Sequence, residues 1–203
     1  VERLNVPIAS TLLGKSIIRE DHPLYVGVYG GLIARDEVQQ FINASDCLLI
    51  LGSILSDVED LNADSPLLTE GRTIHATADR VAIKHHRYDA IRFQDFVKAL
   101  ATNPLPSFPS RPLPAPLALA QGTIASDAPV TLNGLFRHLD SLLDEKTLVI
   151  ADVGESLFAA ADLHVHGRFE FISPAYYTSM GFAIPAAVGA SFADPTLRPI
   201  VLV

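Results

Sequence analysis

The sequence predicts an α/β protein in which parallel strands alternate with helices. Short apolar runs at 46–52 and 146–152 are typical of buried strands, and runs at 35–45 and 131–145 carry apolar residues at helical spacing. Such runs alternate along the chain, which indicates parallel sheets with helices on both faces. The chain has 203 residues, 49% of them hydrophobic, so it can bury a sizeable core.

In the first half of the chain, apolar and amphipathic runs follow one another closely. We predict strands at 5–11, 46–52, 72–78 and 89–93, and helices at 35–45 and 93–101. The helix at 35–45 places Val38, Phe41 and Ile42 on one stripe. The fully buried strand at 46–52 contains Cys47, the only cysteine, which we expect to be a buried small hydrophobe.

A proline-rich segment separates the two halves. The stretch TNPLPSFPSRPLPAP, residues 102–116, excludes helix and central strand, because proline fixes φ and has no N–H to donate. We therefore predict a linker at 102–129, between one domain at 1–101 and a second at 130–203.

In the second half the alternation resumes. We predict helices at 131–145, 155–163 and 181–194, and strands at 146–152, 168–173 and 198–203. Thr131 is the expected N-cap of the first helix. The apolar stripe of that helix consists of Leu132, Leu135, Phe136, Leu139, Leu142 and Leu143. The helix at 181–194 is built largely of small residues, so we expect it to pack closely on its neighbours.

The charge and the composition exclude several classes of partner. The formal net charge is −8, which argues against nucleic acid or an anionic membrane surface. No apolar run is long enough to span a bilayer, and the opening VERLNVP lacks the pattern of a signal peptide. A single cysteine allows no disulfide within the chain. We therefore expect a cytoplasmic protein.

Two junctions between a strand and a helix are candidate binding sites. In VIADVGES, 149–156, a buried strand runs into Gly154 and then into a helix, the place where open α/β sheets bind ligands. In PAYYTSMGFAIP, 174–185, Met180 lies where a loop enters a helix, and its polarizable thioether suits contact with a flat ring. From these residues alone, an ordinary tight turn and a core methionine remain open as alternatives.

Four stretches together resemble the thiamine-diphosphate-dependent 2-oxo acid decarboxylases, especially the indolepyruvate and phenylpyruvate decarboxylases. These stretches are PIASTLLGKSIIREDHPLYVGVYGG, DCLLILGSILSDV, IADVGESLFAAADL and YYTSMGFAIPAAVGA. The resemblance implies a Rossmann-like middle domain with a parallel sheet at 1–101. It also implies that 130–203 is the first part of an α/β diphosphate-binding domain. The family's preceding pyrimidine-binding domain has no counterpart in this sequence.

By this resemblance, the TSMG loop meets the aminopyrimidine end of thiamine diphosphate. Met180 takes the position of the bulky apolar residue that holds the cofactor in a bent shape. Thr178 would offer its backbone carbonyl to the cofactor's amino group, and Ser179 lies in the same loop.

The resemblance assigns the loop at Gly154, Glu155 and Ser156 to the diphosphate end. Glu155 stands where the family often has a hydroxyl residue, and a carboxylate turned inward would repel phosphate. We therefore expect the backbone N–H of Glu155, or Ser156, to bind the diphosphate.

The family's Mg²⁺ site begins with Gly-Asp-Gly after a strand like RPIVLV, and this sequence ends there, at Val203. We therefore expect a fragment, inactive by itself, with neither a catalytic residue nor a metal ligand among these residues. The full-length protein would be a homodimer or homotetramer that converts a small 2-oxo acid to an aldehyde and CO₂ with thiamine diphosphate and Mg²⁺.

Two other functions remain open. One is a carboligase similar to acetolactate synthase, and the other is a non-catalytic nucleotide-binding or regulatory module, against which the missing GxGxxG pattern counts. The pair His85–His86 is not expected to inherit the family's catalytic histidine pair, because that pair belongs to the absent first domain. We expect it to have a structural or surface role.

Overall fold

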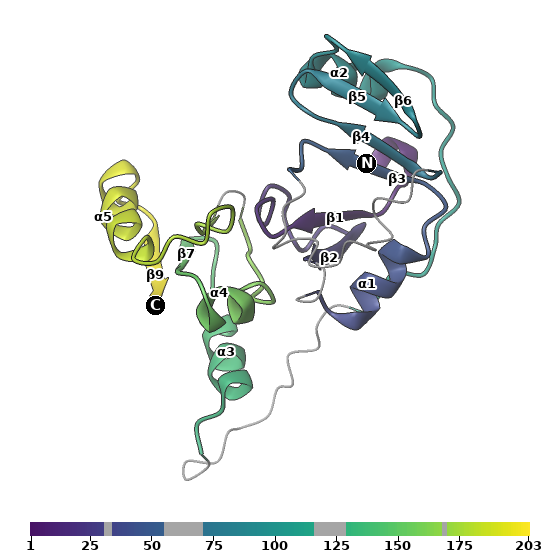
Figure 1. Cartoon of the computed structure of the whole chain (residues 1–203). Helices are drawn as coiled ribbons and strands as arrows, with labels where there is room; N and C mark the ends of the chain where they lie inside the picture. The colour runs from purple at the N-terminus through teal and green to yellow at the C-terminus, as the bar shows by residue number, and fades with distance from the viewer. Residues whose placement is uncertain (31–33, 55–70, 116–128, 168–169) are drawn as a thin grey trace.

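The computed structural model describes residues 1–30, 34–54, 71–115, 129–167 and 170–203. It consists of two α/β units, which we call the first unit (residues 1–115) and the second unit (residues 129–203) (Figure 1). The first unit contains η1 (Glu2–Leu4), β1 (Ile8–Thr11), β2 (Tyr25–Tyr29), α1 (Asp36–Asn43), β3 (Leu48–Leu51), β4 (Thr73–Ala76), β5 (Arg80–Ile83), β6 (His86–Asp89) and α2 (Phe93–Thr102). The second unit contains α3 (Leu132–Asp140), β7 (Thr147–Ala151), α4 (Glu155–Ala160), β8 (Phe171–Ile172), α5 (Ala183–Ala193) and β9 (Arg198–Leu202).

The predicted α/β class is confirmed, and most predicted elements are present with shifted ends. In the first unit, β1 and β2 pair in parallel, and so do β3 and β4. Helix α1 packs against β2, where Val38 is fully buried. The approach is close at Gly27, since a Cβ there would lie 2.9 Å from Val38 Cγ2. Glycine at this position lets the helix pack directly on the strand.

The described strands of the first unit form two sheets, the parallel pair β1-β2 and a four-stranded sheet that is mixed, not wholly parallel. Strands β5 and β6 form an antiparallel hairpin that extends the sheet in the order β3-β4-β5-β6. The strand predicted at 89–93 is wrong, because β6 ends at Asp89 and α2 begins at Phe93. The hairpin was not predicted, since its turn residue Lys84 adopts a positive φ of 54° without the glycine or asparagine that usually signals such a turn.

The prediction of a fully buried strand around Cys47 is also wrong. Cys47 is exposed, and β3 buries only one face, with Leu49 and Leu51 40% and 41% exposed. The physical reason is position, because β3 is the end strand of its four-stranded sheet. An uninterrupted apolar run cannot distinguish a central strand from an edge strand.

The proline-rich segment has no helix or strand over 103–115, as its composition predicted, but the exclusion of helix at residue 102 is wrong, because Thr102 is the last residue of α2. It lies along the first unit, where Phe108 N donates to Leu4 O at 2.8 Å and Asn5 Nδ2 donates to Phe108 O at 2.9 Å. Farther along, Arg35 donates to Ala115 O. The remaining linker residues 116–128 lie outside the described part of the chain, and the domain boundaries stay a prediction.

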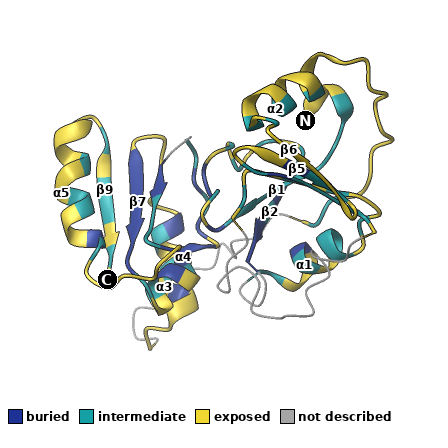
Figure 2. Ribbon diagram, turned by 45° about the horizontal axis from the view of Figure 1, so that its top comes forward, coloured by how far each residue is buried: buried dark blue, intermediate teal, exposed yellow. Residues whose placement is uncertain are grey.

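In the second unit, β7 is the central strand of a three-stranded parallel sheet in the order β8-β7-β9. All five residues of β7 are buried (Figure 2). Its side chains alternate between two cores. Val149 and Ala151 face the larger core, which includes residues of α4, and Leu148 and Ile150 face the core under α5.

Helix α3 begins as predicted, with Thr131 Oγ1 accepting a hydrogen bond from Gly134 N at 3.1 Å. It ends at Asp140, before the predicted end at 145, because Asp144 and Thr147 form a hydrogen-bonded turn into β7. The predicted stripe is only partly buried, since Leu132 and Leu135 are exposed. Helix α4 ends at Ala160 and not at 163, and of the strand predicted at 168–173 the structure forms β8, with 168–169 outside the described residues.

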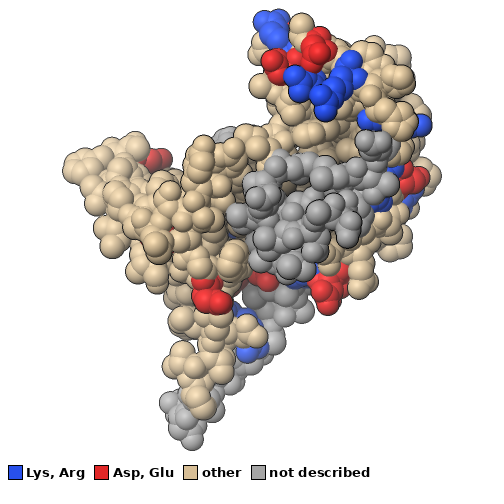
Figure 3. Space-filling view, viewed as in Figure 1, with Lys and Arg blue, Asp and Glu red and all other residues tan. Residues whose placement is uncertain are grey.

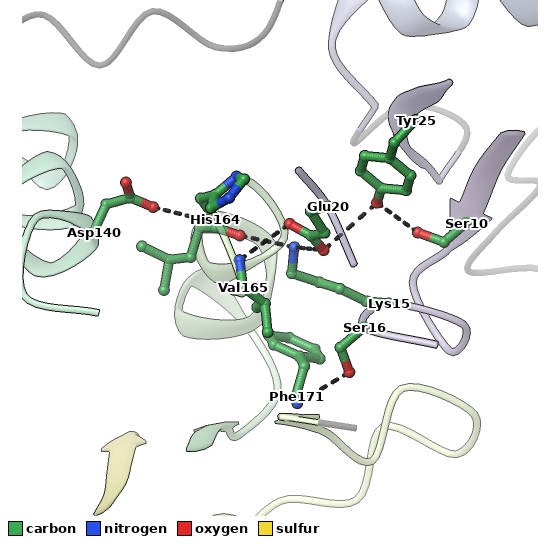
Figure 4. A network of polar contacts seen from close by, with 10 residues as sticks. Ser10, Lys15, Ser16, Glu20, Tyr25, Asp140, His164, Val165 and Phe171 are labelled. Atoms are coloured by element: carbon green, nitrogen blue, oxygen red, sulfur yellow. Dashed lines mark hydrogen bonds and ion pairs between the residues drawn. The ribbon is translucent and has the colours of Figure 1, made fainter. Parts of the chain in front are cut away.

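The two units share a core and a buried polar network (Figure 4). Leu12 and Val28 of the first unit belong to the same apolar cluster as the larger core of the second unit. Next to Leu12, the Lys15 ammonium donates to Glu20 at 2.7 Å and to the backbone oxygen of Leu163 at 2.8 Å. The side chains of Lys15 and Glu20 are only 1% and 6% exposed.

This network binds backbone atoms in the connection that follows α4 and at the first residue of β8. Glu20 Oε2 accepts from Val165 N at 3.2 Å, and Ser16 Oγ accepts from Phe171 N at 3.2 Å. On the other side, Tyr25 OH lies 2.8 Å from Ser10 Oγ, and burial raises the pKa of this tyrosine. The segment between β1 and β2 therefore acts as a brace, which we define as residues 12–25, between the two units.

We expect Lys15→Met to lower the free energy of unfolding by about 3 kcal/mol, because it leaves the Glu20 carboxylate buried without its cation. Urea unfolding followed by circular dichroism measures this change. Arg19→Met is the matched control in the same brace, since the Arg19–Asp21 pair is exposed and is expected to contribute far less. Equal losses in the two variants would contradict the assignment of the buried pair.

Candidate functional site

The candidate site lies at the carboxyl edge of the sheet in the second unit. Because β7, β8 and β9 are parallel, the loops that follow them emerge at the same edge. The loop after β7 is 152–154 and leads into α4, and the segment after β8 is 173–182 and leads into α5. The two candidate stretches of the sequence are therefore neighbours in space, as the topology rule for open α/β sheets requires.

The loop after β7 turns at Gly154, which caps α4 with φ 91° and ψ −150°. This conformation is strained for any residue with a Cβ, so glycine is required by the backbone. A Cβ at Gly154 would meet no atom within 4 Å, so the loop faces open space. Within the described part of the chain, the backbone N–H groups of Gly154, Glu155 and Ser156 donate to no protein acceptor. These donors, with the Ser156 hydroxyl, form a set suited to an anion.

The segment after β8 makes a tight turn in which two residues adopt positive φ. Thr178 has φ 50° and Gly181 has φ 83°. Thr178 N donates to Pro174 O at 2.8 Å and closes the first part of the turn. Ser179 and Met180 follow, both exposed, with the Met180 side chain 88% exposed. Within the described part of the chain, Met180 is therefore not a core residue.

Thr178 is unusual, because a β-branched residue rarely adopts the left-handed region. Such strain is concentrated at functional sites in proteins. Here it falls on the residue whose carbonyl is expected to face the cofactor.

Asp152 joins the two loops. Its Oδ1 accepts from Val153 N at 2.9 Å, and its Oδ2 accepts from Gly181 N at 3.0 Å and from Ala183 N at 3.3 Å. The hydrogen bond from Val153 N–H, together with those from the turn, holds the pKa of this carboxyl below its usual range against the opposing effect of burial. The carboxylate therefore stays ionised and connects the end of β7 to the start of α5.

Sequence reasoning missed Asp152 as a site residue. A signal was available, because an aspartate that directly follows a buried strand needs a partner for its charge. What the sequence does not contain is the identity of that partner, since Gly181 and Ala183 are about thirty residues away along the chain.

The other candidates lie elsewhere or are absent. His85 and His86 are exposed on the β5–β6 hairpin of the first unit, so a surface location is confirmed. Among the described residues, no group of three or more His, Cys, Asp or Glu side chains is arranged to hold a metal ion. None of the helices in the described ranges is long and apolar enough to cross a membrane.

Comparison with known proteins assigns the family. Residues 1–103 match the central domain of the thiamine pyrophosphate enzymes, and residues 152–203 match their C-terminal TPP-binding domain. The chain therefore belongs to the thiamine pyrophosphate enzyme family. Both candidate loops fall inside the region that matches the TPP-binding domain.

Three similar proteins are named as decarboxylases. The chain is 29% identical over 205 residues to indole-3-pyruvate decarboxylase of Azospirillum brasilense, covering 100% of this chain and 37% of that protein. It is 26% identical over 199 residues to pyruvate decarboxylase of Hanseniaspora uvarum, covering 97% and 35%. It is 28% identical over 200 residues to alpha-keto-acid decarboxylase of Mycobacterium tuberculosis, covering 98% and 36%. The chain thus spans little more than a third of the length of these relatives.

We expect Thr178→Gly to be more stable than Thr178→Ala by about 1 kcal/mol, because alanine keeps the cost of positive φ and glycine does not. Both variants lose the Thr178 hydroxyl and its hydrogen bond to Tyr177 O, so the comparison isolates the backbone. Thermal unfolding of the two variants measures the difference. An alanine variant as stable as the glycine variant would show that the turn is not strained at this residue.

Proposed function

We propose that this chain is part of a thiamine-diphosphate- and Mg²⁺-dependent decarboxylase that converts a 2-oxo acid to an aldehyde and CO₂. The substrate would belong to the indolepyruvate, phenylpyruvate or pyruvate class. The observation that carries this proposal is the meeting of the Gly154 loop and the Thr178–Met180 turn at one sheet edge, joined by Asp152. The names of the three relatives support the reaction type.

The residues present fit the cofactor at both of its ends. The unpaired N–H groups of Gly154, Glu155 and Ser156 suit a diphosphate, and the open space at Gly154 admits it. Glu155 is exposed, so its carboxylate can remain in water while its backbone faces the loop. At the other end, the exposed thioether of Met180 offers an apolar surface to an aromatic ring.

When bound, thiamine diphosphate would supply a carbanion for attack on the keto carbon and would accept the electrons released as CO₂ leaves. The residues of this chain would bind and orient it. The Gly154 loop would hold the diphosphate, the backbone carbonyl of Thr178 would accept a hydrogen bond from the amino group, and Met180 would fix the bend of the molecule. Ser179 would complete the turn between these two contacts. The residues that transfer protons and bind Mg²⁺ would come from other parts of the full-length protein.

The outer surface of α5 supports assembly with further protein. The helix has an apolar side chain on every face, yet only its inner face is buried, against Leu148 and Ile150. Its outer face exposes a row of apolar side chains at intervals of four residues: Ile184, Val188 and Phe192. In the view of Figure 3, the part of the second unit formed by α5 carries few charged groups. A helix that is apolar all round is normally buried. We propose that this row is covered in a homodimer or homotetramer of the full-length protein.

A cytoplasmic location is part of the same proposal. It is supported by the single cysteine, which leaves these 203 residues without an internal disulfide.

The direct test uses the full-length protein with thiamine diphosphate and Mg²⁺. We expect aldehyde and CO₂ in equal amounts from at least one of indolepyruvate, phenylpyruvate and pyruvate, and no product from residues 1–203 alone. Acetolactate formed from pyruvate without free acetaldehyde would indicate the carboligase instead. Tight FAD or ADP in the purified protein, with no binding of thiamine diphosphate, would indicate the non-catalytic nucleotide-binding module.

We expect Met180→Ala in the full-length enzyme to lower kcat by about tenfold or more, because a misplaced reacting group costs rate steeply. The apparent affinity for thiamine diphosphate should change much less, since Met180 would shape the cofactor without anchoring its charged end. Met180→Leu is the control, as it keeps a bulky apolar side chain and should retain most of the activity. An alanine variant with unchanged turnover would rule out this role.

A further inference from the structure

Asp152 is a nearly buried carboxylate whose partners are all in the backbone. It is 8% exposed and directly follows β7, and its own N–H donates to Leu202 O of β9 at 2.7 Å. Within the described residues, every hydrogen bond recorded for its carboxylate comes from a backbone N–H group. A buried charge is costly unless it is fully paired, so this arrangement strongly favours one geometry of the loops.

Between Ala175, which is buried in the larger core, and Phe182, which packs against the core under α5, the turn held by this carboxylate has few other attachments. Its side chains at Tyr177 and Met180 are largely exposed. The recorded hydrogen bonds of Thr178 go to Pro174 and Tyr177, which lie in the same segment. Among the described residues, two hydrogen bonds connect the end of the turn to the end of β7. Gly181 N and Ala183 N donate them to the Asp152 carboxylate.

The same carboxylate also fixes the other loop. Through Val153 N, Oδ1 of Asp152 sets the direction of the chain just before Gly154. Oδ2 meanwhile receives the N–H of Ala183, the first residue of α5, where the helix dipole favours a negative charge. One side chain therefore sets the spacing between the Gly154 loop and the Thr178–Met180 turn.

We propose that Asp152 is a positioning residue that fixes the turn carrying Thr178 and Met180 relative to the diphosphate loop at Gly154. This inference rests on the proposed function, because the two loops are taken to hold the two ends of thiamine diphosphate. Because its carboxylate is engaged by backbone N–H groups of the two loops, Asp152 would act through these loops and not by touching the cofactor or the substrate. It would act by keeping the Thr178 carbonyl and the Met180 side chain in the positions from which they could contact the cofactor.

The test is Asp152→Asn in the full-length protein. The amide has the shape of the carboxylate, but one of its two ends is an NH₂ group that must face an N–H donor. The amide also lacks the charge that strengthens all three hydrogen bonds, so those from Gly181 and Ala183 are lost when the NH₂ group faces them and weakened when it faces Val153. In the protein without cofactor, we expect faster hydrogen–deuterium exchange in the peptide that spans 176–184, with exchange in β7 unchanged. Loaded with thiamine diphosphate and Mg²⁺, the variant should lose kcat by about 10- to 100-fold, with a much smaller change in apparent cofactor affinity.

Asp140→Asn is the matched control. Asp140 is 5% exposed and also accepts a backbone N–H, that of His164, but it lies at the end of α3 and makes no recorded contact with the turn. We expect this variant to leave exchange at 176–184 and kcat unchanged. Should Asp152→Asn fail to fold, Asp152→Glu keeps the charge and displaces it by one methylene, and the same exchange pattern is expected in a weaker form.

Unchanged exchange at 176–184 in the folded Asp152 variant would overturn the inference. A parallel loss of kcat, cofactor affinity and melting temperature, matched by Asp140→Asn, would also overturn it, since that pattern indicates general destabilisation. Failure of the proposed function is a separate result: the wild-type protein would bind no thiamine diphosphate. The role toward the cofactor would then fall with it, whereas the exchange experiment would still report whether Asp152 holds the turn.

Discussion

The complete burial of β7 is the constraint on which the second unit depends. Both edges of this strand are paired, with β8 and with β9, and both faces are covered by apolar cores. A strand held in this way cannot shift its register without exposing one whole set of side chains. The loops that leave the sheet edge thus start from fixed positions. Asp152 directly follows this strand, and its hydrogen bonds with Gly181 and Ala183 attach the turn before α5 to the fixed strand end.

The contact between the two units has a different chemistry. Apolar packing at Leu12 is joined by a buried ammonium and carboxylate, Lys15 and Glu20, which bind backbone atoms of the second unit (Figure 4). Polar groups buried in this way specify one geometry more strictly than apolar contacts do, because every group left unpaired is costly.

The place that the brace binds is relevant to the site. The backbone atoms that accept from or donate to the brace belong to Leu163 and Val165, which follow α4, and to Phe171, the first residue of β8. This connection leads from the Gly154 loop to the turn at Thr178. The first unit therefore stabilises the stretch of chain between the two candidate loops through hydrogen bonds with the brace, although both loops belong to the second unit.

The sequence by itself determined the class of the fold, the order of most elements and the identity of both candidate loops. These features are local, since hydrophobic periodicity, the prolines at 103–115 and the glycine at Gly154 depend on residues near one another in the chain. Tertiary structure decided what depends on distant neighbours. It exposed Cys47 at a sheet end, added the β5–β6 hairpin and buried the Lys15–Glu20 pair. It also brought Asp152 to Gly181, because the partner of a buried charge is chosen by the packing of strands and not by the sequence beside it.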